Sequence, residues 1–421
     1  MSKPHVLVLG GNFAGLGAAQ KIRQYAQDAV DITVIDRKPY LLFVPNLPEE
    51  VFENHDPTLS LHMPLAPALV EDNITFIQAE VKSLDVETQT VEYVPTERPG
   101  AAPERIHYDY VVVAVGARLA YDKIEGFAEY GHAVSDTYYA NRLRRYLWNE
   151  YKGGPVAIGS ARFHQGTMTK DLVPMAEAAC EGPPVELTLS MGTWLKQHGM
   201  GGPDKVTVFT PAEVIAEDAG PRVVSELLNA AAAMGYHYLN KTHDIKRITA
   251  DGIEFESGAS VEAELKIVLP DWVPHDFLKG LPISDDVGFV LTDLYMRNPK
   301  YPNVFAVGDA AAVTVPKLGM IAHLGDEVVG RQLAKDVGRM SAEQANLPLK
   351  PVINCIGSMG DNQAFYINSD AWFGGSKQVL KMGHIPFLLK MQYKELFFRT
   401  KGKVPDWGMQ ASEFLAEKLF G

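Results

Sequence analysis

The 421-residue sequence predicts an α/β fold with more than one parallel sheet, and three stretches support this prediction. The first 36 residues alternate strand, glycine-rich turn, helix and strand. A second strand and turn begin at Gly154, and a late strand over 303–307 runs into Gly308 and Asp309. The chain exceeds the ~250–300 residues at which one hydrophobic core stops growing, so we expect at least two domains.

Composition and charge exclude several classes of protein. Apolar residues make up 46% and charged residues 22%, as in ordinary globular proteins. The net charge of −13 gives no support for a nucleic-acid partner. Cys180 and Cys355 are too few for a disulfide framework or a structural zinc site, so we expect no metal. No signal peptide is visible, and no apolar run approaches the ~18 residues of a membrane-spanning helix.

The N-terminal segments fit a dinucleotide-binding fingerprint. They follow one another as strand 6–9, turn 10–15 (Gly-Gly-Asn-Phe-Ala-Gly), helix 16–26 and strand 31–35, which ends at Asp36. Such glycines let the backbone approach a pyrophosphate at the helix N-terminus, and the acid accepts hydrogen bonds from ribose hydroxyls. Asn12 replaces the middle glycine, which weakens the match, and an ordinary βαβ turn is the alternative.

Two later strands extend this pattern. Residues 108–116 read as a buried strand that ends in Gly116, and the late strand delivers Asp309 to the start of a helix. Together with the fingerprint, they resemble the flavoprotein superfamily with two Rossmann-like dinucleotide-binding domains, in which the late aspartate bonds the ribityl chain of FAD. The resemblance implies an FAD domain that is discontinuous, over 1–120 and 285–345, a second domain over 121–284, and a C-terminal region over 346–421.

The second domain lacks what a nicotinamide dinucleotide needs. Its turn runs Gly159-Ser-Ala-Arg-Phe-His-Gln-Gly166, with no further glycine in the fingerprint register. The next strand, 205–209, ends at Thr210 and not at an acid. We therefore expect the electrons to come from a donor other than NADH.

The two cysteines lie in distinct contexts. Cys180 precedes a predicted helix that runs to about Gln197, and a helix N-terminus lowers the pKa of a thiol, which suits a nucleophile. Cys355 lies in a β-like segment, 351–356, before a predicted turn at 357–360. The alternative is that the two cysteines are unrelated buried thiols, because only the fold can bring them together.

These contexts resemble the sulfide:quinone oxidoreductases, and the resemblance spans essentially the whole chain. It rests on the Cys-x-Gly-Pro-x-x-Glu pattern at 180–186 and on the C-terminal cysteine strand. The archaeal-type members are most similar, through Arg162-Phe-His-Gln-Gly, Ala179-Cys-Glu-Gly-Pro and Val315-Pro-Lys-Leu-Gly. In that family the two matching cysteines form the redox site beside the flavin and hold sulfane sulfur between them.

The resemblance assigns roles to further residues. Glu186 matches the motif glutamate and would take up the hydrosulfide proton, although a helix-surface carboxylate is an equal alternative. Lys317 would place positive charge near the reduced flavin, unless it is a plain surface lysine. The residues expected to bind FAD are Gly10, Asn12, Phe13, Ala14, Gly15, Asp36, Arg37, Val44, Pro45, Val81, Ala114, Gly116, Gly308, Asp309, Lys317 and Gly319.

One departure from the family concerns a third, upstream cysteine. Ser135 stands at the matching position, within His132-Ala-Val-Ser-Asp. In several members that cysteine lies near the flavin attachment or the sulfide path. We therefore expect FAD to be bound noncovalently, while the redox pair is unaffected.

The C-terminal region predicts contact with a membrane. Residues 376–403 contain seven basic residues and one acid, interleaved with apolar and aromatic side chains. A stripe of Ile385, Leu389, Tyr393 and Leu396 follows helical spacing, with Lys390, Lys394 and Arg399 beside it, which is typical of a helix in the lipid headgroup layer. A helix that caps the core is the alternative. Phe387, Tyr393 and Phe397 are the candidate walls of a quinone site, and 407–420 repeats the pattern more weakly.

The leading interpretation is an FAD-dependent sulfide:quinone oxidoreductase, peripheral (monotopic) on the cell membrane, with sulfide and quinone as substrates and a homo-oligomer left open. The flavoprotein subunit of a flavocytochrome c sulfide dehydrogenase is an alternative, disfavoured by the missing signal peptide and the apolar tail. A type II NADH:quinone oxidoreductase is disfavoured by the degenerate second fingerprint. A membrane-docked, non-catalytic flavin redox sensor remains the non-enzymatic alternative.

Overall fold

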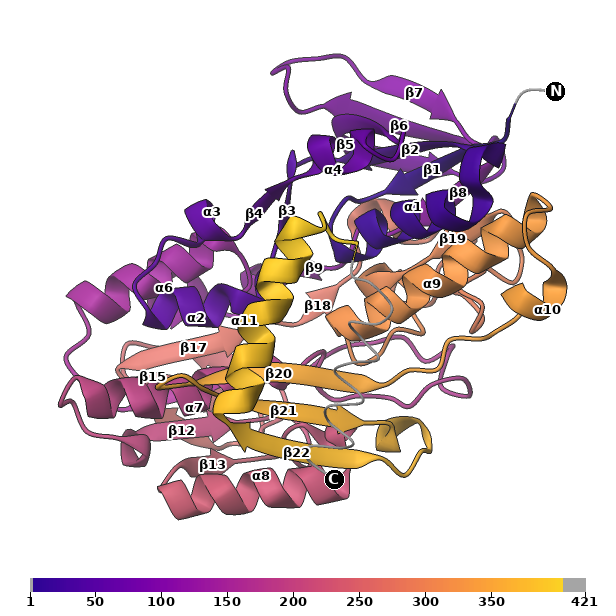
Figure 1. Cartoon of the computed structure of the whole chain (residues 1–421). Coiled ribbons are helices and arrows are strands. Elements are labelled where there is room, and N and C mark those ends of the chain that lie inside the picture. Colours follow the sequence, from indigo (N-terminus) through magenta and orange to yellow (C-terminus); the bar gives the residue numbers. More distant parts are fainter. Residues whose placement is uncertain (1–2, 404–421) are drawn as a thin grey trace.

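The computed structural model describes residues 3–403, which form two large sheets and several smaller ones (Figure 1). The first sheet has seven strands: β1 (His5–Leu9), β2 (Asp31–Asp36), β5 (Thr75–Asp85), β6 (Thr90–Pro95), β7 (Glu104–His107), β8 (Tyr110–Val113) and β19 (Val304–Ala306). Their order is β19-β8-β1-β2-β5-β6-β7, and the pairs from β19 to β5 are parallel. Strands from both ends of the sequence therefore share one sheet.

Two long helices, α1 (Phe13–Ala26) and α9 (Gly319–Asp336), pack along each other in this part of the molecule (Figure 1). The helices approach closely at glycines: a Cβ on Gly17 would lie 1.9 Å from the side-chain atom Oδ2 of Asp326 in α9. Helix α1 begins at Phe13, earlier than the predicted start at 16, because extended backbone ends at Asn12. The last residues of the fingerprint thus form the first turn of the helix.

The second large sheet is all parallel. Its strands are β10 (Gly131–His132), β11 (Val156–Ser160), β12 (Val206–Phe209), β13 (His237–Leu239) and β17 (Leu265–Leu269), in the order β10-β17-β11-β12-β13. Helix α7 (Gly182–Gln197) packs against β11 and β12, which it connects along the chain. The other helices of this part are α5 (Phe127–Tyr130), α6 (Thr137–Asn149) and α8 (Pro221–Met234).

A third, antiparallel sheet lies beside α7. It contains β20 (Ile353–Gly360), β21 (Gln363–Ser369) and β22 (Gln378–Gly383), and α11 (His384–Arg399) packs on it (Figure 1). The turn expected at 357–360 lies instead at Asp361 and Asn362, which both have positive φ, as in a tight type I′ hairpin. Strand β20 therefore continues past Cys355 to Gly360.

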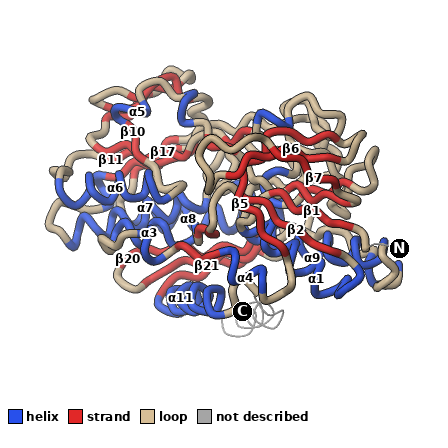
Figure 2. The backbone as a smooth tube through the Cα atoms, turned by 90° about the horizontal axis from the view of Figure 1, so that it is seen from above, coloured by secondary structure: helices blue, strands red, loops and turns tan. Residues whose placement is uncertain are grey.

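Short elements complete the described chain. They are β3 (Tyr40–Leu42) with β4 (His62–Pro64), β9 (Arg118–Leu119) with β18 (Trp272–Val273), the hairpins of β14 (Ile245–Ile248), β15 (Gly252–Phe255) and β16 (Ser260–Glu262), and the helices α2 (Leu47–Phe52), α3 (Pro57–Ser60), α4 (Leu65–Val70) and α10 (Ala342–Ala345). Viewed from above, α5 and α11 lie on opposite sides of the molecule (Figure 2).

Candidate active site

The glycine-rich turn after β1 is tightly packed. A Cβ on Gly10, which has φ +102°, would lie 2.3 Å from the carbonyl oxygen of Ala114, which follows β8. A Cβ on Gly15 would lie 1.8 Å from the carbonyl oxygen of Gly10. Neither position accepts a side chain, so these glycines are required by the close approach of β1, β8 and α1.

The polar groups of this turn fit the phosphate and ribose of FAD. Gly11 N–H donates to Asp36 Oδ2 at 2.7 Å, so the acid at the end of β2 is held beside the turn. Asn12 Oδ1 is buried and has no hydrogen-bond partner among the described residues. The first N–H groups of α1 point out of the helix at the same place. The unpartnered Asn12 Oδ1, the free N–H groups of α1 and the carboxylate of Asp36 together form a site suited to FAD, which we call the FAD cradle.

Asp309 approaches this cradle from the other end of the chain. Gly308 has φ +67°, and a Cβ on it would lie 2.6 Å from the Cβ of Ala14 in α1. This contact turns the chain, so that Asp309 lies in a 3-10 turn, η7 (Gly308–Ala310), and not at the start of an α-helix as predicted. Burial raises the pKa of Asp309, and the nearby Lys317 acts against this shift.

Lys317 is a buried cation. Its side chain is 2% exposed, and Nζ donates to the Ala311 carbonyl oxygen at 2.8 Å and lies 4.4 Å from the ring centroid of Phe289. Burial lowers the pKa of Lys317 to about 8, while Asp309 and Asp285 oppose the change. The alternative of a plain surface lysine is therefore wrong.

The remaining residues expected near FAD occupy several elements. Val44 and Pro45 are exposed in the 3-10 turn η2 (Val44–Asn46), and Gly319 is the first residue of α9. Arg37 is exposed directly after β2, Val81 lies at a β-bulge of β5, and Gly116 follows β8 with φ +70°. Their contact with FAD stays a prediction.

Cys180 and Cys355 meet at the amino end of α7. Cys180 lies two residues before the helix, and a Cβ on Gly182 would be 3.0 Å from Cys355 Sγ. Both are free thiols in this structure. The N–H of Lys317 donates to the carbonyl oxygen of Ala179 at 2.7 Å, which joins the cysteine segment to the cradle. The fold thus places two cysteines distant in sequence beside Lys317 and Asp309.

The pKa of Cys180 is raised, contrary to the prediction, although the N–H of Gly182 at the helix N-terminus acts to lower it. Burial raises it well above the ordinary value, and the charges of Cys355 and Asp218 add to the shift. Burial also raises the pKa of Cys355 to about 12, with further contributions from Glu186 and Asp218. Desolvation of a thiolate here outweighs the attraction of the helix end, so both thiols are protonated near neutral pH.

Glu186 belongs to a buried polar cluster that four elements share. Its Oε1 accepts the Ser358 N–H at 2.9 Å and an ion pair from Lys390 Nζ. Lys390 Nζ also donates to Ser358 Oγ at 3.1 Å, and Ser358 Oγ donates to Glu49 Oε2 at 3.2 Å. These residues come from α7, β20, α11 and α2. The cluster therefore connects the Cys355 strand to the C-terminal helix.

Two basic residues of α11 point inward and not toward lipid headgroups, contrary to the prediction. Lys390 is 3% exposed and pairs with Glu186, and Lys394 Nζ donates to Glu50 Oε1 at 2.7 Å, so neither reaches toward lipid headgroups. Ion pairing with carboxylates of α2 and α7 explains their inward direction. The exposed apolar side chains of α11 include Ile385 and Leu388, at 50% and 57%.

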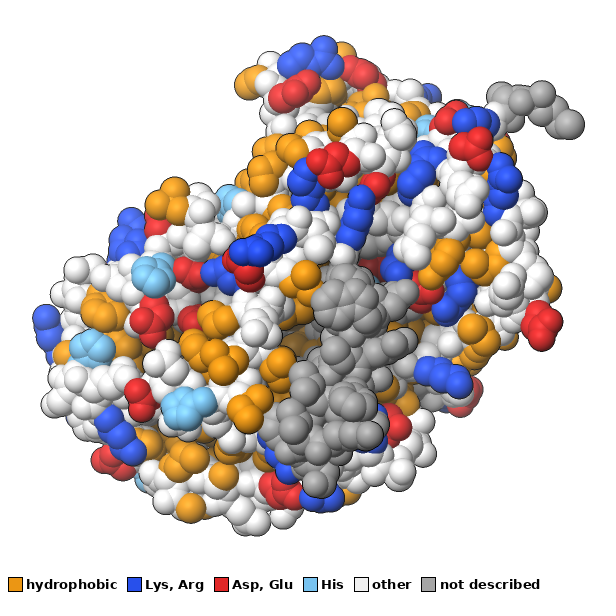
Figure 3. Space-filling model, in the orientation of Figure 1, with side chains coloured by type: hydrophobic (Ala, Val, Ile, Leu, Met, Phe, Trp, Pro, Cys, Tyr) orange, Lys and Arg blue, Asp and Glu red, His pale blue; other side chains and the backbone are white. Residues whose placement is uncertain are grey.

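The face that carries α11 shows hydrophobic side chains among charged ones (Figure 3). No helix within residues 3–403 is long and apolar enough to cross a membrane. The weaker amphipathic segment predicted at 407–420 lies outside the described residues.

Two of the proposed quinone residues belong to an aromatic cluster. The ring centroid of Phe397 lies 5.2 Å from that of Phe13 and 5.1 Å from that of Phe43, and the Phe43 and Tyr393 centroids are 5.9 Å apart. Phe43 directly precedes η2. Phe387 is half-buried in the first turn of α11 and takes part in none of the ring pairs found within 3–403. The cluster joins α11 to the start of α1.

Two acids near the cysteines, Glu181 and Asp218, were not identified from the sequence. Glu181 is 5% exposed, its Oε2 accepts the Ala216 N–H at 2.6 Å, and burial raises its pKa to about 8. Burial and the charge of Glu217 raise the pKa of Asp218 to about 6. Position next to Cys180 could have drawn attention to Glu181. Nothing in the sequence pattern marks Asp218, because only the tertiary fold brings it here.

The first glycine of the second nucleotide-type turn serves packing within the sheet. A Cβ on Gly159 would lie 2.2 Å from the carbonyl oxygen of Phe209, so this glycine serves the contact between β11 and β12. Residues 161–181 contain no helix or strand and separate β11 from α7. Thr210 is fully buried, and its Oγ1 accepts the Ala212 N–H at 3.2 Å. Ser135 lies elsewhere, after β10 and before the Asp136 cap of α6.

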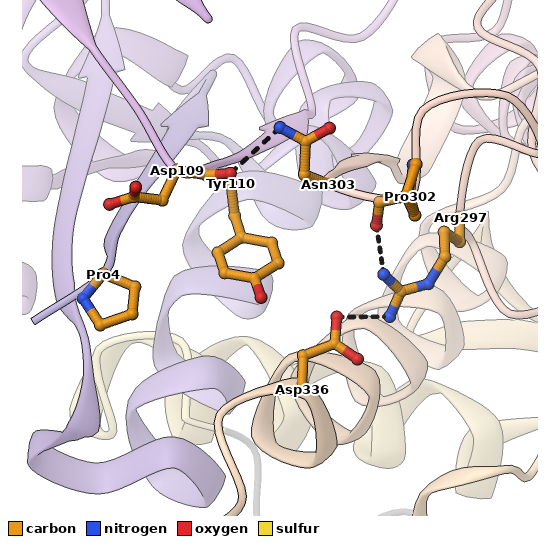
Figure 4. Close-up of a pocket in the computed structure, with 7 residues that line it drawn as sticks. All are labelled: Pro4, Asp109, Tyr110, Arg297, Pro302, Asn303 and Asp336. Carbon is orange, nitrogen blue, oxygen red and sulfur yellow. Dashed lines mark hydrogen bonds and ion pairs between the residues drawn. The ribbon is translucent and has the colours of Figure 1, made fainter.

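A surface pocket lies at the opposite edge of the first sheet, beside the amino ends of β1, β8 and β19 (Figure 4). Its arginine, Arg297, donates to Asp336 Oδ2 at 2.7 Å and is therefore already paired. The glycine turn and Asp309 follow the carboxyl ends of the same strands, where open parallel sheets bind their ligands. The pocket of Figure 4 is separate from the candidate site.

Comparisons with known proteins show which proteins this chain resembles. Residues 4–158 match the family described as Pyridine nucleotide-disulphide oxidoreductase. The chain is 25% identical to a sulfide-quinone reductase of Aquifex aeolicus, over 93% of this chain and 90% of that protein. It is 28% identical to the demethylphylloquinone reductase NdbB of a Synechocystis strain, over 74% and 72% of the two chains.

A solved structure has the same fold. The X-ray structure of the sulfide:quinone oxidoreductase from Aquifex aeolicus superposes with a TM-score of 0.82 at 22% identity, covering 99% of this chain and 96% of that one. The expected Rossmann-like α/β fold is confirmed. The resemblance to the sulfide:quinone oxidoreductases is confirmed as well, and this chain is an FAD-dependent oxidoreductase.

Proposed function

We propose that this protein oxidises hydrosulfide to sulfane sulfur or polysulfide at Cys180 and Cys355 and passes the electrons through FAD to a quinone. The observation that carries the proposal is the meeting of the two cysteines at the amino end of α7, beside the Lys317 segment of the FAD cradle. The names of the relatives support the substrates, since they combine sulfide with quinone or act on a quinone.

The chemistry begins at the oxidised cysteine pair. Hydrosulfide attacks one sulfur, forms a persulfide on that cysteine and releases the other as a thiolate. The apolar surroundings that raise the pKa of both thiols also exclude water from the persulfide. FAD, when bound, supplies the two-electron acceptor. The segments before α7 and after η7 hold the sulfurs at the cradle through the bond between Lys317 N–H and Ala179.

Lys317 and Asp309 shape the electrostatics of the donor side. Lys317 keeps its Nζ among carbonyl oxygens and the Phe289 ring, so its position is determined by packing. As a buried cation it favours negative charge that develops nearby. Asp309 holds a carboxyl group at the η7 turn, where the ribityl hydroxyls of FAD would be bound. The absence of a cysteine at Ser135 supports noncovalent binding.

The acceptor side uses the C-terminal helix. The aromatic cluster of Phe13, Phe43, Tyr393 and Phe397 stands next to Val44 and Pro45, the segment expected against the isoalloxazine. Tyr393 is 38% exposed, so the cluster reaches the surface. A quinone ring that enters here would stack on aromatic faces, with Phe387, Tyr393 and Phe397 as candidate walls.

Peripheral membrane binding would bring a lipid-soluble quinone to this helix. Ile385 and Leu388 provide exposed apolar area on α11, without a spanning helix in the described chain. Replacing both by aspartate should reduce co-flotation with anionic liposomes. Tyr130→Asp, on α5 at the opposite side of the molecule, is the control (Figure 2). Equal flotation of all three proteins would contradict this surface.

The proposed division of labour follows the domains inferred from the sequence. Residues 1–120 and 285–345 hold FAD, residues 121–284 supply Cys180, and residues 346–421 supply Cys355 and the acceptor helix. The strands of the first sheet, which come from 5–113 and 304–306, support the discontinuous first domain.

Anaerobic half-reactions test the function. Sulfide should bleach the flavin absorbance of the purified protein, and a short-chain quinone should restore it. Flavin that stays oxidised with excess sulfide would refute sulfide oxidation. Flavin that sulfide bleaches but quinone leaves reduced would refute only the acceptor.

A further inference from the structure

We propose that the carboxylate of Asp218 is the base that receives the hydrosulfide proton at the cysteine pair. This inference rests on the proposed function, because it assigns a residue to its first step. Four carboxylates lie near the pair: Asp309, which belongs to the FAD cradle, and Glu186, Glu181 and Asp218. The contacts of each decide which of them can accept a proton.

The turn that carries Asp218 is held against the cysteine segment. Asp218 lies in the 3-10 turn η5 (Glu217–Ala219), directly after Ala216. Ala216 is 5% exposed and has φ 54° and ψ 40°, a left-handed conformation that is unfavourable for a residue with a Cβ. Its N–H donates to Glu181 Oε2 at 2.6 Å, next to Cys180. Strain of this kind concentrates at functional sites, where surrounding contacts maintain it.

The same turn also reaches the strand of the second cysteine. Turn η5 packs against β21 and against the 3-10 turn η8 (Ala371–Phe373). In β21, Ile367 is the register partner of Cys355. Asp218 is accordingly the carboxylate whose charge raises the pKa of both cysteines, whereas Glu186 contributes only to that of Cys355.

Glu186 and Glu181 are engaged in other contacts. Glu186 Oε1 accepts both the Ser358 N–H and the ammonium of Lys390, so its contacts direct it to the α11 side. Glu181 has a pKa of about 8, so it carries its own proton at pH 7 and cannot accept another. Asp218, with a pKa of about 6, is ionised at pH 7 and can return the proton to water.

The groups that face Asp218 are known from the elements packed around it. Glu217, in its own turn, raises its pKa, and Asp218 in turn raises that of Glu181. Strand β21 and turn η8 contain no charged residues. Helix α8 contributes Arg222 and Glu226 next to the turn, and these pair with each other at 2.9 Å. The acids, the two cysteines and Lys390, which acts to lower the pKa of Cys355, therefore determine the local charge.

The proton balance of the step is simple. Hydrosulfide and the oxidised pair form one S–S bond and break another, leaving a protonated persulfide on one cysteine and a thiolate on the other. The Asp218 carboxylate takes the persulfide proton, giving a persulfide anion and a carboxylic acid. Closure of the anion and the thiolate into a trisulfide releases two electrons, which FAD accepts.

Alkylation tests the placement of Asp218 without sulfide. In the reduced holoprotein, D218N should lower the pKa of both thiols, so iodoacetamide should modify Cys180 and Cys355 several-fold faster at pH 8, as measured by peptide mass spectrometry. E213Q removes an exposed carboxylate of the same loop and should leave both rates unchanged. Unchanged labelling of either cysteine in D218N would overturn the proposal.

The rate of flavin reduction by sulfide tests the role itself. The wild-type rate should rise through about pH 6, and D218N should lose that limb and react on the order of 100-fold more slowly at pH 7. D218E should restore most of the rate, which a merely structural defect would not allow. A wild-type pH profile retained in D218N would refute the base. Wild-type flavin that sulfide never bleaches refutes the proposed function, whereas the alkylation result still decides where Asp218 acts.

Discussion

Lys390 and Glu186 form a buried ion pair that joins two segments more than 200 residues apart. The side chains are 3% and 8% exposed, and Ser358 bonds both partners. The pair connects the helix that begins beside Cys180 with the C-terminal helix α11. It therefore links the sulfur side of the molecule to the proposed quinone side.

Removing one member of this pair should destabilise the protein more than removing both. K390M leaves the Glu186 carboxylate buried without its cation, which typically costs about 3–5 kcal/mol. The double variant K390M/E186Q lacks that uncompensated charge and should recover a large part of the loss. Urea unfolding of the holoproteins measures both differences.

The control is on the same helix. Arg399 pairs with Glu395 at the surface, with side chains 76% and 64% exposed, so R399M should change stability by less than ~0.5 kcal/mol. If K390M is as stable as R399M, the buried pair contributes nothing to the fold. If the double variant is less stable than K390M, burial of an unpaired carboxylate is the wrong explanation.

Serine at either cysteine should abolish turnover with sulfide while the protein keeps its bound FAD. Each cysteine supplies one half of the redox pair, and the chain has no third. S135C should leave the rate nearly unchanged. Steady-state quinone reduction measures all three variants. More than a tenth of the rate in C355S, a loss below ~1.4 kcal/mol of transition-state stabilisation, contradicts the two-cysteine mechanism.

NADH should not reduce the flavin at a useful rate. No glycine follows Gly159 in the fingerprint register, and Thr210 is buried at the end of β12, where an acid would bind ribose. Stopped-flow mixing with NADH, compared with sulfide in the same preparation, measures the difference. Saturable bleaching by NADH as fast as by sulfide would favour the NADH:quinone oxidoreductase interpretation.

Replacing Glu181 by glutamine should stabilise the protein increasingly as pH rises. The pKa of Glu181 is about 8 in the folded state against an ordinary 4.5, so between these values the folded state holds a proton that the unfolded state has lost. Wild-type stability should therefore fall with rising pH across this window, by up to ~1.4 kcal/mol per pH unit from this group. E181Q lacks this dependence.

Thermal unfolding at pH 5 and pH 8 measures the effect. The Tm of E181Q minus that of the wild type should be larger at pH 8. E213Q, which changes an exposed glutamate, should give the same Tm difference at both values. Equal differences for E181Q at the two pH values would mean that Glu181 titrates normally in the folded protein.

Local sequence patterns determined the helices and strands of the part of the chain that was predicted to bind FAD. Strand-turn-helix order, with glycines at 10 and 15 and an acid at 36, depends on contacts within about 30 residues, and the structure places these segments as expected. The cysteine motifs likewise identified the type of oxidoreductase. Such features are readable because short-range backbone geometry restricts the residue types that fit.

Tertiary structure alone decided the charge environment of the site. Helical spacing placed Lys390 on a headgroup face, but Glu186 and Ser358, distant in sequence, draw it into the interior. The helix end predicted a reactive thiolate at Cys180, but burial raises its pKa. The charge of Asp218 acts on both cysteines only because η5 packs on β21 in the folded chain. Burial and long-range pairing set the free energy of a charge, and neither is encoded in the residues next to it along the chain.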